Sequence, residues 1–167
     1  GYRDNFTEAF PVLRKYRAKA TVFMTTSNFG KPERLSVPDA KAMLAGDVGF
    51  QSHSVTHPDL TTLSIERLRG ELRDSKHTIE SHLDTRVTSI AYPSGAHDDR
   101  VIEEVRAANY VAGWDKGGGP VEPRHSADPF RLPRVRVHGR TDMGAFKRKV
   151  ESGYWVMRMR AARQRSS

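Results

Sequence analysis

Two histidines, His53 and His57, are the residues of this sequence whose types and spacing could do chemistry. They lie in the stretch GFQSHSVTHPDLTTLS, residues 49–64, with three residues between them. On a helical turn, two imidazoles at this spacing face the same way, and each can offer one nitrogen to the same Zn²⁺ ion. The spacing also fits a turn in which both rings hydrogen-bond to the backbone, so it leaves both interpretations open.

A metal site built on these histidines needs a third ligand, and the composition restricts its type. The chain contains no cysteine, so the ligand must be another His, an Asp or a Glu. Asp115 follows a predicted strand and is a candidate, whereas Asp59 is too close in sequence to be an obvious partner.

Strand and helix patterns alternate along the chain, and these elements must position the histidines. Strands are predicted at 19–26, 48–53, 87–93, 111–115 and 130–137, and helices at 5–17, 36–45, 64–83, 98–110 and 141–152. Such alternation is typical of a parallel sheet covered by helices, with ligands at the carboxyl ends of the strands. The unusual residues that follow strands are His53, His57, Tyr92, Pro93, Trp114, Asp115 and His138. The order of elements alone allows a barrel or a doubly wound open sheet.

Local signals indicate how several of these elements begin and pack. The apolar, β-branched run 19–26 predicts a strand that is buried on both faces. The expected N-caps of the first, second and fourth helices are Asp4 or Asn5, Ser36, and Asp98 or Asp99.

The charge of the chain is uneven. The formal net charge is +8, and the stretch RMRAARQRSS at the C-terminal end has four arginines and no acidic residue. A nucleic-acid partner is not expected, because no aromatic residue interleaves with these arginines as in single-strand binders. We expect one domain over 1–155 and a solvated basic tail over 156–167. No apolar run is long enough to cross a bilayer.

The stretch SHSVTHPDL resembles the second motif of the polysaccharide deacetylases (carbohydrate esterase family four, or NodB-homology domain), whose H-[ST]-x-x-H pattern is here His53 to His57. GYRDNFTEAFPVLRKYRAKATVFMTT resembles the segment that follows the family's first motif, and SIAYPSGAHDDRVIEEVRAANY resembles the third motif and its helix. DPFRLPRVRV resembles the late strand of the subgroup that acts on cell-surface polysaccharides. The segments follow the family's order over nearly the whole chain.

The resemblance implies an α/β fold, a distorted (β/α)7 barrel, and a metal-dependent hydrolase that removes N-acetyl, or in some members O-acetyl, groups from sugar polymers. His53 and His57 would bind a divalent metal, with zinc expected and cobalt or nickel as alternatives. Thr56 is expected to tie its loop by hydrogen bonding. The expected partner is an acetylated polysaccharide or oligosaccharide. The resemblance indicates a cell-surface or extracytoplasmic site, whereas the chain itself leaves compartment and oligomeric state open.

The sequence departs from the family pattern at its start. The family's Asp-Asp pair, which supplies the general base and the third metal ligand, would stand directly before Gly1 and is not in this sequence. We therefore expect a chain truncated just after this pair, which lacks the first barrel strand, binds metal weakly and turns over poorly. Asp4 is not expected to substitute, because it lies past the required position and is better placed to cap a helix.

The third motif also departs from the pattern. Ala91 and Ser94 stand where family members often carry an arginine that orients the base and a tyrosine whose N–H binds the oxyanion. Ser94 is expected to keep the oxyanion role, because a backbone donor does not depend on its side chain. The residues expected to line the substrate groove are Tyr92, Pro93 and Trp114. His138, after the last predicted strand, is the candidate general acid.

Three functions follow from these patterns. The leading hypothesis is a deacetylase that hydrolyses an acetamide on a surface glycan. The second is a non-catalytic carbohydrate-binding remnant of the same fold, which keeps the groove without the aspartates. The third is a basic nucleic-acid binder, whose affinity would fall steeply with salt.

Overall fold

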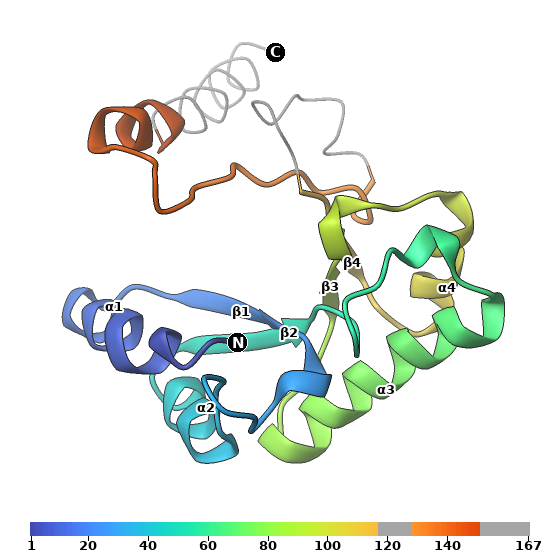
Figure 1. Cartoon of the computed structure of the whole chain (residues 1–167), viewed down its shortest axis with the longest axis horizontal. Coiled ribbons are helices and arrows are strands. Elements are labelled where there is room, and N and C mark those ends of the chain that lie inside the picture. Colours follow the sequence, from blue (N-terminus) through green and yellow to red (C-terminus); the bar gives the residue numbers. More distant parts are fainter. Residues whose placement is uncertain (117–127, 151–167) are drawn as a thin grey trace, which may run out of the picture.

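The computed structural model describes residues 1–116 and 128–150, whose elements are arranged as in Figure 1. The strands are β1 (Ala20–Met24), β2 (Val48–Ser52), β3 (Ser89–Ala91) and β4 (Ala112–Trp114). The helices are a π-helical turn Asn5–Ala9 that continues into α1 (Phe10–Tyr16), α2 (Val37–Leu44), α3 (Ile65–Leu83), α4 (Asp99–Ala107) and a helix over 143–150. Short 3-10 turns lie at Thr26–Asn28, Leu60–Thr62 and Pro93–Gly95. None of the described helices is both long and apolar enough to cross a bilayer.

The four strands form one parallel sheet in the order β1-β2-β3-β4. Met24 pairs with Ser52, and Ser52 pairs in turn with Ile90, so the carboxyl ends of these strands lie at one edge. Figure 1 shows β1 and β2 running across the view and β3 and β4 standing steeply, so the sheet is strongly twisted. The predicted α/β fold with a parallel sheet is confirmed, and His53 directly follows β2 at the edge where such sheets bind ligands.

The helices α2 and α3 pack against β2, and α4 packs against α3. One face of α3 is apolar, and its residues Leu68, Leu72, Ile79 and Leu83 are all buried in the core. Burial of this stripe against the sheet fixes the helix beside the end of β2, where the histidine loop begins.

Most of the predicted helix caps are confirmed. Ser36 and Asp39 form a capping box at the start of α2, and the Asp98 carboxylate accepts a hydrogen bond from the Val101 N–H at 2.8 Å. The cap predicted at Asp4 or Asn5 is wrong: Asp4 already has helical backbone angles, and no side chain caps this end. The chain enters a π-helical turn here, and its first N–H groups donate to backbone carbonyls instead of a capping side chain, as in the bond from the Asn5 N–H to the Tyr2 carbonyl at 3.1 Å.

The prediction that the first strand is buried on both faces is wrong. Only Met24 of β1 is buried, and Thr21 is exposed. The face that carries Thr21 and Phe23 borders an open cavity together with Trp114 and Arg134 instead of a packed layer. An apolar run therefore overstated the burial of a strand that lies at the outer edge of the described sheet.

The late strand predicted at 130–137 does not form. Leu132 makes an isolated parallel bridge with Trp114, and residues 133–138 are irregular. β4 ends at Trp114, so the segment runs out of partner strand, and Pro133 has no N–H to donate. The helix predicted at 141–152 is present over 143–150. The basic tail 156–167 and most of the loop 116–129 lie outside the described residues.

Tyr92 connects β4 to the segment around Phe130. Its side chain is fully buried, and its hydroxyl donates a hydrogen bond to the Phe130 carbonyl at 2.8 Å. A Cβ at Gly113 would lie 2.2 Å from this hydroxyl, so only glycine lets the ring lie here. The buried hydroxyl therefore ties β3, β4 and residue 130 into one unit.

We expect Tyr92→Phe to lower the free energy of unfolding by about 1–2 kcal/mol, because the Phe130 carbonyl loses its buried donor. Urea denaturation monitored by circular dichroism measures this change. Tyr16→Phe is the control, at a side chain that is 70% exposed, and should change the free energy by less than about 0.5 kcal/mol. Equal effects of the two substitutions would contradict a structural role for the Tyr92 hydroxyl.

Candidate metal centre

The two histidines meet at the end of β2 without forming a helical turn. The His53 N–H donates to the Met24 carbonyl at 2.9 Å, which continues the β1–β2 pairing by one residue. The chain then bends sharply, because Ser54 (φ 62°) and His57 (φ 64°) both adopt left-handed backbone angles. The two ring centroids lie 4.7 Å apart, with the planes 81° to one another. Of the two geometries that the spacing left open, the helical turn does not form, but the imidazoles do come together.

The backbone of β3 determines which nitrogen of His53 is free. Nδ1 lies 2.6 Å from the Ala91 carbonyl oxygen, which can only accept, so Nδ1 carries the hydrogen and Nε2 keeps its lone pair. Burial lowers the pKa of His53 to about 4; the bond to Ala91 opposes this shift, and the neighbouring charges of His57 and Arg134 add to it. The ring is therefore neutral at physiological pH, the state in which imidazole binds metals.

Both histidines line a cavity of about 430 Å³ at the carboxyl ends of β1 and β2. Its other lining residues are Gly1, Tyr2, Phe23, Thr25, Asn28 and Arg34. The Arg34 guanidinium lies 4.0 Å from the centre of the Tyr2 ring. The cavity thus combines aromatic surface with polar and cationic groups, a lining that suits a polar ligand such as a sugar.

The two imidazoles fit a divalent metal as a pair of ligands. Within residues 1–116 and 128–150, no cluster of three His, Asp or Glu side chains accompanies them. The Asp115 carboxylate instead accepts a hydrogen bond from the Lys116 N–H, and Asp59 caps the Leu60–Thr62 turn by accepting from the Thr61 N–H at 3.0 Å. Neither aspartate lines the histidine cavity, so the structure does not support Asp115, the candidate third ligand.

Tyr92 and Pro93 lie beneath the protein surface. Both side chains are buried, an arrangement that does not support the prediction that they contact substrate. The Tyr92 ring instead stacks on His97, with centroids 4.7 Å apart. Ser94 is exposed and left-handed (φ 55°), and its N–H donates no hydrogen bond among the described residues. Ser94 is not among the residues that line the histidine cavity, and its oxyanion role stays a prediction.

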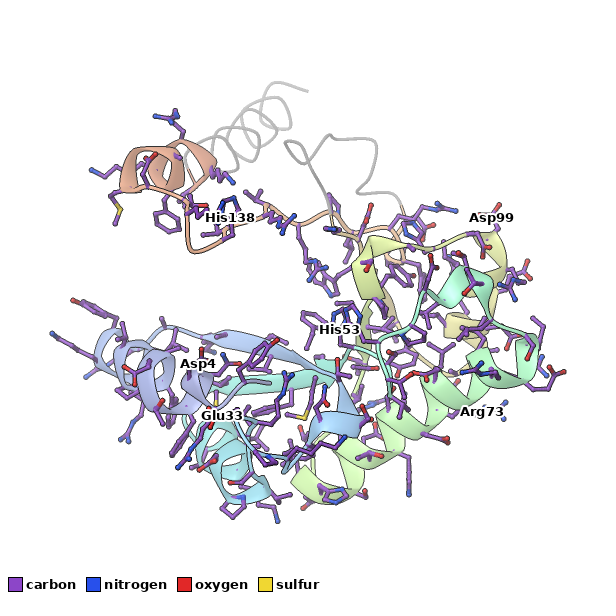
Figure 2. The ribbon with its side chains drawn as sticks, viewed as in Figure 1. Asp4, Glu33, His53, Arg73, Asp99 and His138 are labelled. Atoms are coloured by element: carbon purple, nitrogen blue, oxygen red, sulfur yellow. The ribbon has the colours of Figure 1, made fainter. Side chains whose placement is uncertain are left out.

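Trp114 and His138 are not brought into the histidine cavity. Trp114 is half-buried and packs edge-on against Phe23, with centroids 6.4 Å apart, beside a second cavity on the open face of the sheet. Phe23 lines both cavities, so Trp114 lies next to the site rather than in it. His138 is exposed, and Figure 2 shows it on the far segment of the chain, well away from His53. Its expected role as general acid is not supported by this arrangement.

Two charged residues beside the site were missed from the sequence. The Glu71 carboxylate of α3 accepts hydrogen bonds from the N–H groups of Val55 and Thr56, at 2.8 and 2.9 Å, and from the Thr56 hydroxyl at 2.6 Å. Thr56 thus ties its loop as predicted. The Arg134 Nε donates to the Asp115 carbonyl at 2.6 Å. The sequence could have indicated Glu71, because this charged residue lies on the face of α3 that carries the buried apolar side chains. No sequence pattern indicated Arg134, because it lies in an irregular segment.

The family model for the polysaccharide deacetylases matches residues 1–113 of the chain. The chain belongs to this family. Bacillus subtilis YxkH is 30% identical over 152 residues, which cover 91% of this chain and 54% of that protein. The poly-beta-1,6-N-acetyl-D-glucosamine N-deacetylase of Staphylococcus epidermidis is 29% identical over 79% of this chain and 50% of its own length. The chain thus spans about half the length of these polysaccharide deacetylase relatives.

Solved structures of polysaccharide deacetylases share the fold. The Streptococcus pyogenes deacetylase PplD, in complex with acetate, has a TM-score of 0.81 and 29% identity, over 89% of this chain and 66% of PplD. The polysaccharide deacetylase BC0361 from Bacillus cereus has a TM-score of 0.78 and 29% identity, over 90% of this chain and 48% of its own. The predicted fold class, that of the polysaccharide deacetylases, is therefore confirmed.

We expect the metal-free protein to lose stability as the pH falls from about 6.5 to about 4, because the unfolded His53 takes up a proton more readily than the buried one. Its folded pKa is below the unfolded value, so its contribution is present above pH 6.5 and lost on acidification. Nuclear magnetic resonance of the ring carbons gives the pKa, and urea midpoints across this pH range give the stability. His53→Asn should flatten the slope. A His53 ring that titrates near 6.5 would contradict this prediction.

Proposed function

We propose that the chain forms part of a metal-dependent deacetylase that hydrolyses the acetamide of N-acetylated sugars in a surface polysaccharide. Water adds to the acetyl group, and acetate and a free amine leave. The observation that carries this proposal is the pair of facing imidazoles, His53 and His57, on the wall of one cavity at the carboxyl ends of the strands. Family membership supports the reaction class, and O-acetyl groups are the alternative substrate.

His53 and His57 would hold the metal, with zinc expected and cobalt or nickel able to replace it. A bound divalent metal polarises the acetyl carbonyl and lowers the pKa of water toward about 7. The chain's own residues prepare this site. The Ala91 carbonyl holds the His53 ring in the tautomer that leaves Nε2 free, and burial keeps that ring neutral. The Ser94 N–H would donate to the oxyanion that develops on the acetyl oxygen.

The substrate class is proposed from the relatives and the cavity together. The Staphylococcus epidermidis relative is a poly-beta-1,6-N-acetyl-D-glucosamine N-deacetylase, and PplD was solved with acetate, the acid that such a reaction releases. The cavity of about 430 Å³ is large enough for one acetylated sugar unit. A surface polymer lies outside the cytoplasm, so we propose that the protein acts there.

A second function, non-catalytic glycan binding, is favoured by the metal ligands that the described residues contribute. The described residues contribute two imidazoles without a carboxylate, and the chain also resembles the Bacillus anthracis family-four pseudoenzyme BA3943, with a TM-score of 0.55 and 25% identity. A non-catalytic glycan-binding domain would keep the cavity and bind polymer without releasing acetate.

Acetate release from a panel of acetylated glycans, by the chain extended upstream of Gly1 to include the family's Asp-Asp pair, tests the two functions. We expect release that a strong chelator abolishes and Zn²⁺, Co²⁺ or Ni²⁺ restores, because the carbonyl must be polarised by the metal. His53→Ala and His57→Ala should each lower the rate at least about 100-fold, since neither ligand alone can hold the ion. His82→Ala, at an exposed histidine of α3, is the control and should change nothing.

The competing outcomes are distinct. Release that persists in chelator would contradict the metal mechanism. If the extended wild-type protein binds glycan but releases no acetate when metal is present, the non-catalytic binding function holds and the enzyme function is contradicted.

A further inference from the structure

Glu71 is a buried carboxylate that no cation neutralises among the described residues. Its residue is only 9% exposed, and no Lys or Arg of residues 1–116 and 128–150 forms an ion pair with it. All three of its hydrogen bonds come from Val55 and Thr56, in the middle of the loop between the two histidines. A buried charge is costly unless donors satisfy it, so the loop and the carboxylate stabilise each other.

The loop needs such an anchor because its backbone is strained. Ser54 and His57 both have positive φ, at 62° and 64°, and a left-handed angle costs about 1–2 kcal/mol for a residue other than glycine. These two bends turn the rings toward each other in place of a helical turn. Conformations of this kind persist only where the surrounding structure holds them.

A second, weaker tie starts one turn further along α3. The Ser75 hydroxyl lies 2.8 Å from the Ser52 hydroxyl, which accepts from the Ser54 N–H at 3.3 Å. The Ser54 hydroxyl in turn accepts from the His57 N–H at 2.9 Å. This chain of neutral bonds fixes the ends of the loop, whereas the charged carboxylate fixes its middle.

We infer that Glu71 is a positioning residue, which holds the His53–His57 loop in the bent conformation that faces the two imidazoles toward one cation. The inference deepens the proposed function and rests on it for the identity of the ligand. Glu71 does not line the cavity and touches neither ring, so its effect passes entirely through the loop backbone. Without it, two N–H groups and one hydroxyl lose their acceptor, and the left-handed bends can relax.

The test compares Glu71→Ala with Glu80→Ala. Glu80 is a matched control, because it also lies on α3 and its carboxylate also accepts from a loop N–H, that of Val87 at 2.9 Å, but away from the histidines. Glu71→Gln is the conservative variant, since its amide keeps an oxygen for the two N–H groups and can donate to the Thr56 hydroxyl.

The first readout is metal-free. We expect amide hydrogen exchange at Val55 and Thr56 to accelerate at least about tenfold in Glu71→Ala, and the nuclear Overhauser contact between the His53 and His57 rings to disappear. Glu80→Ala should leave both unchanged, and Glu71→Gln should restore most of the protection. Unchanged exchange and an intact ring contact in Glu71→Ala would overturn the inference, whether or not the protein binds metal.

The second readout is Co²⁺ titration followed by its visible absorption. We expect Glu71→Ala to weaken binding about 10–100-fold, as for other groups that orient metal ligands, and Glu80→Ala to bind like wild type. Equal losses in both variants would reduce Glu71 to a general stabiliser and overturn the inference. Wild-type protein that binds no Co²⁺, with the exchange and ring contact still dependent on Glu71, would count against the proposed metal function and leave the positioning role established.

Discussion

The contact between the Glu71 carboxylate and the loop from His53 to His57 is the interaction on which the site depends. One buried negative charge accepts three short hydrogen bonds from two consecutive residues, Val55 and Thr56. The loop can therefore keep two left-handed residues that would otherwise relax. Because Glu71 lies on the buried face of α3, packing of that helix against β2 also sets the position of the histidines.

The sheet contributes the other half of the geometry. Parallel strands end at one edge, so the carbonyl of Ala91 at the end of β3 reaches the His53 ring at the end of β2. This bond chooses the tautomer, and burial keeps the ring uncharged. The next turn, Pro93–Gly95, follows directly and carries the exposed residue Ser94. A cavity and a neutral imidazole thus arise from the ends of neighbouring strands.

The positions and types of the elements could largely be predicted, because the burial of α3 and the caps at Ser36 and Asp98 are recorded in local spacing. The errors at Tyr92 and at the predicted late strand have one physical origin, because contacts between distant parts of the chain decided both. Tyr92 resembles a groove residue in sequence, but its hydroxyl finds a partner in Phe130, far along the chain, and the ring is buried. The Val and Arg alternation after Leu132 has strand periodicity, but the short β4 offers it nothing further to pair with.

The sequence by itself determined the alternating strands and helices, the family, and the choice of the two histidines as the candidate site. Each of these depends on residue type and on spacing within one element, and such local patterns are visible in the sequence itself. Only the tertiary structure decided how the imidazoles meet, which ring nitrogen is free, and that His138 and Tyr92 lie outside the cavity. Those features depend on hydrogen bonds between residues 15 to 38 positions apart, such as Thr56 with Glu71 and His53 with Ala91, and no local pattern encodes them.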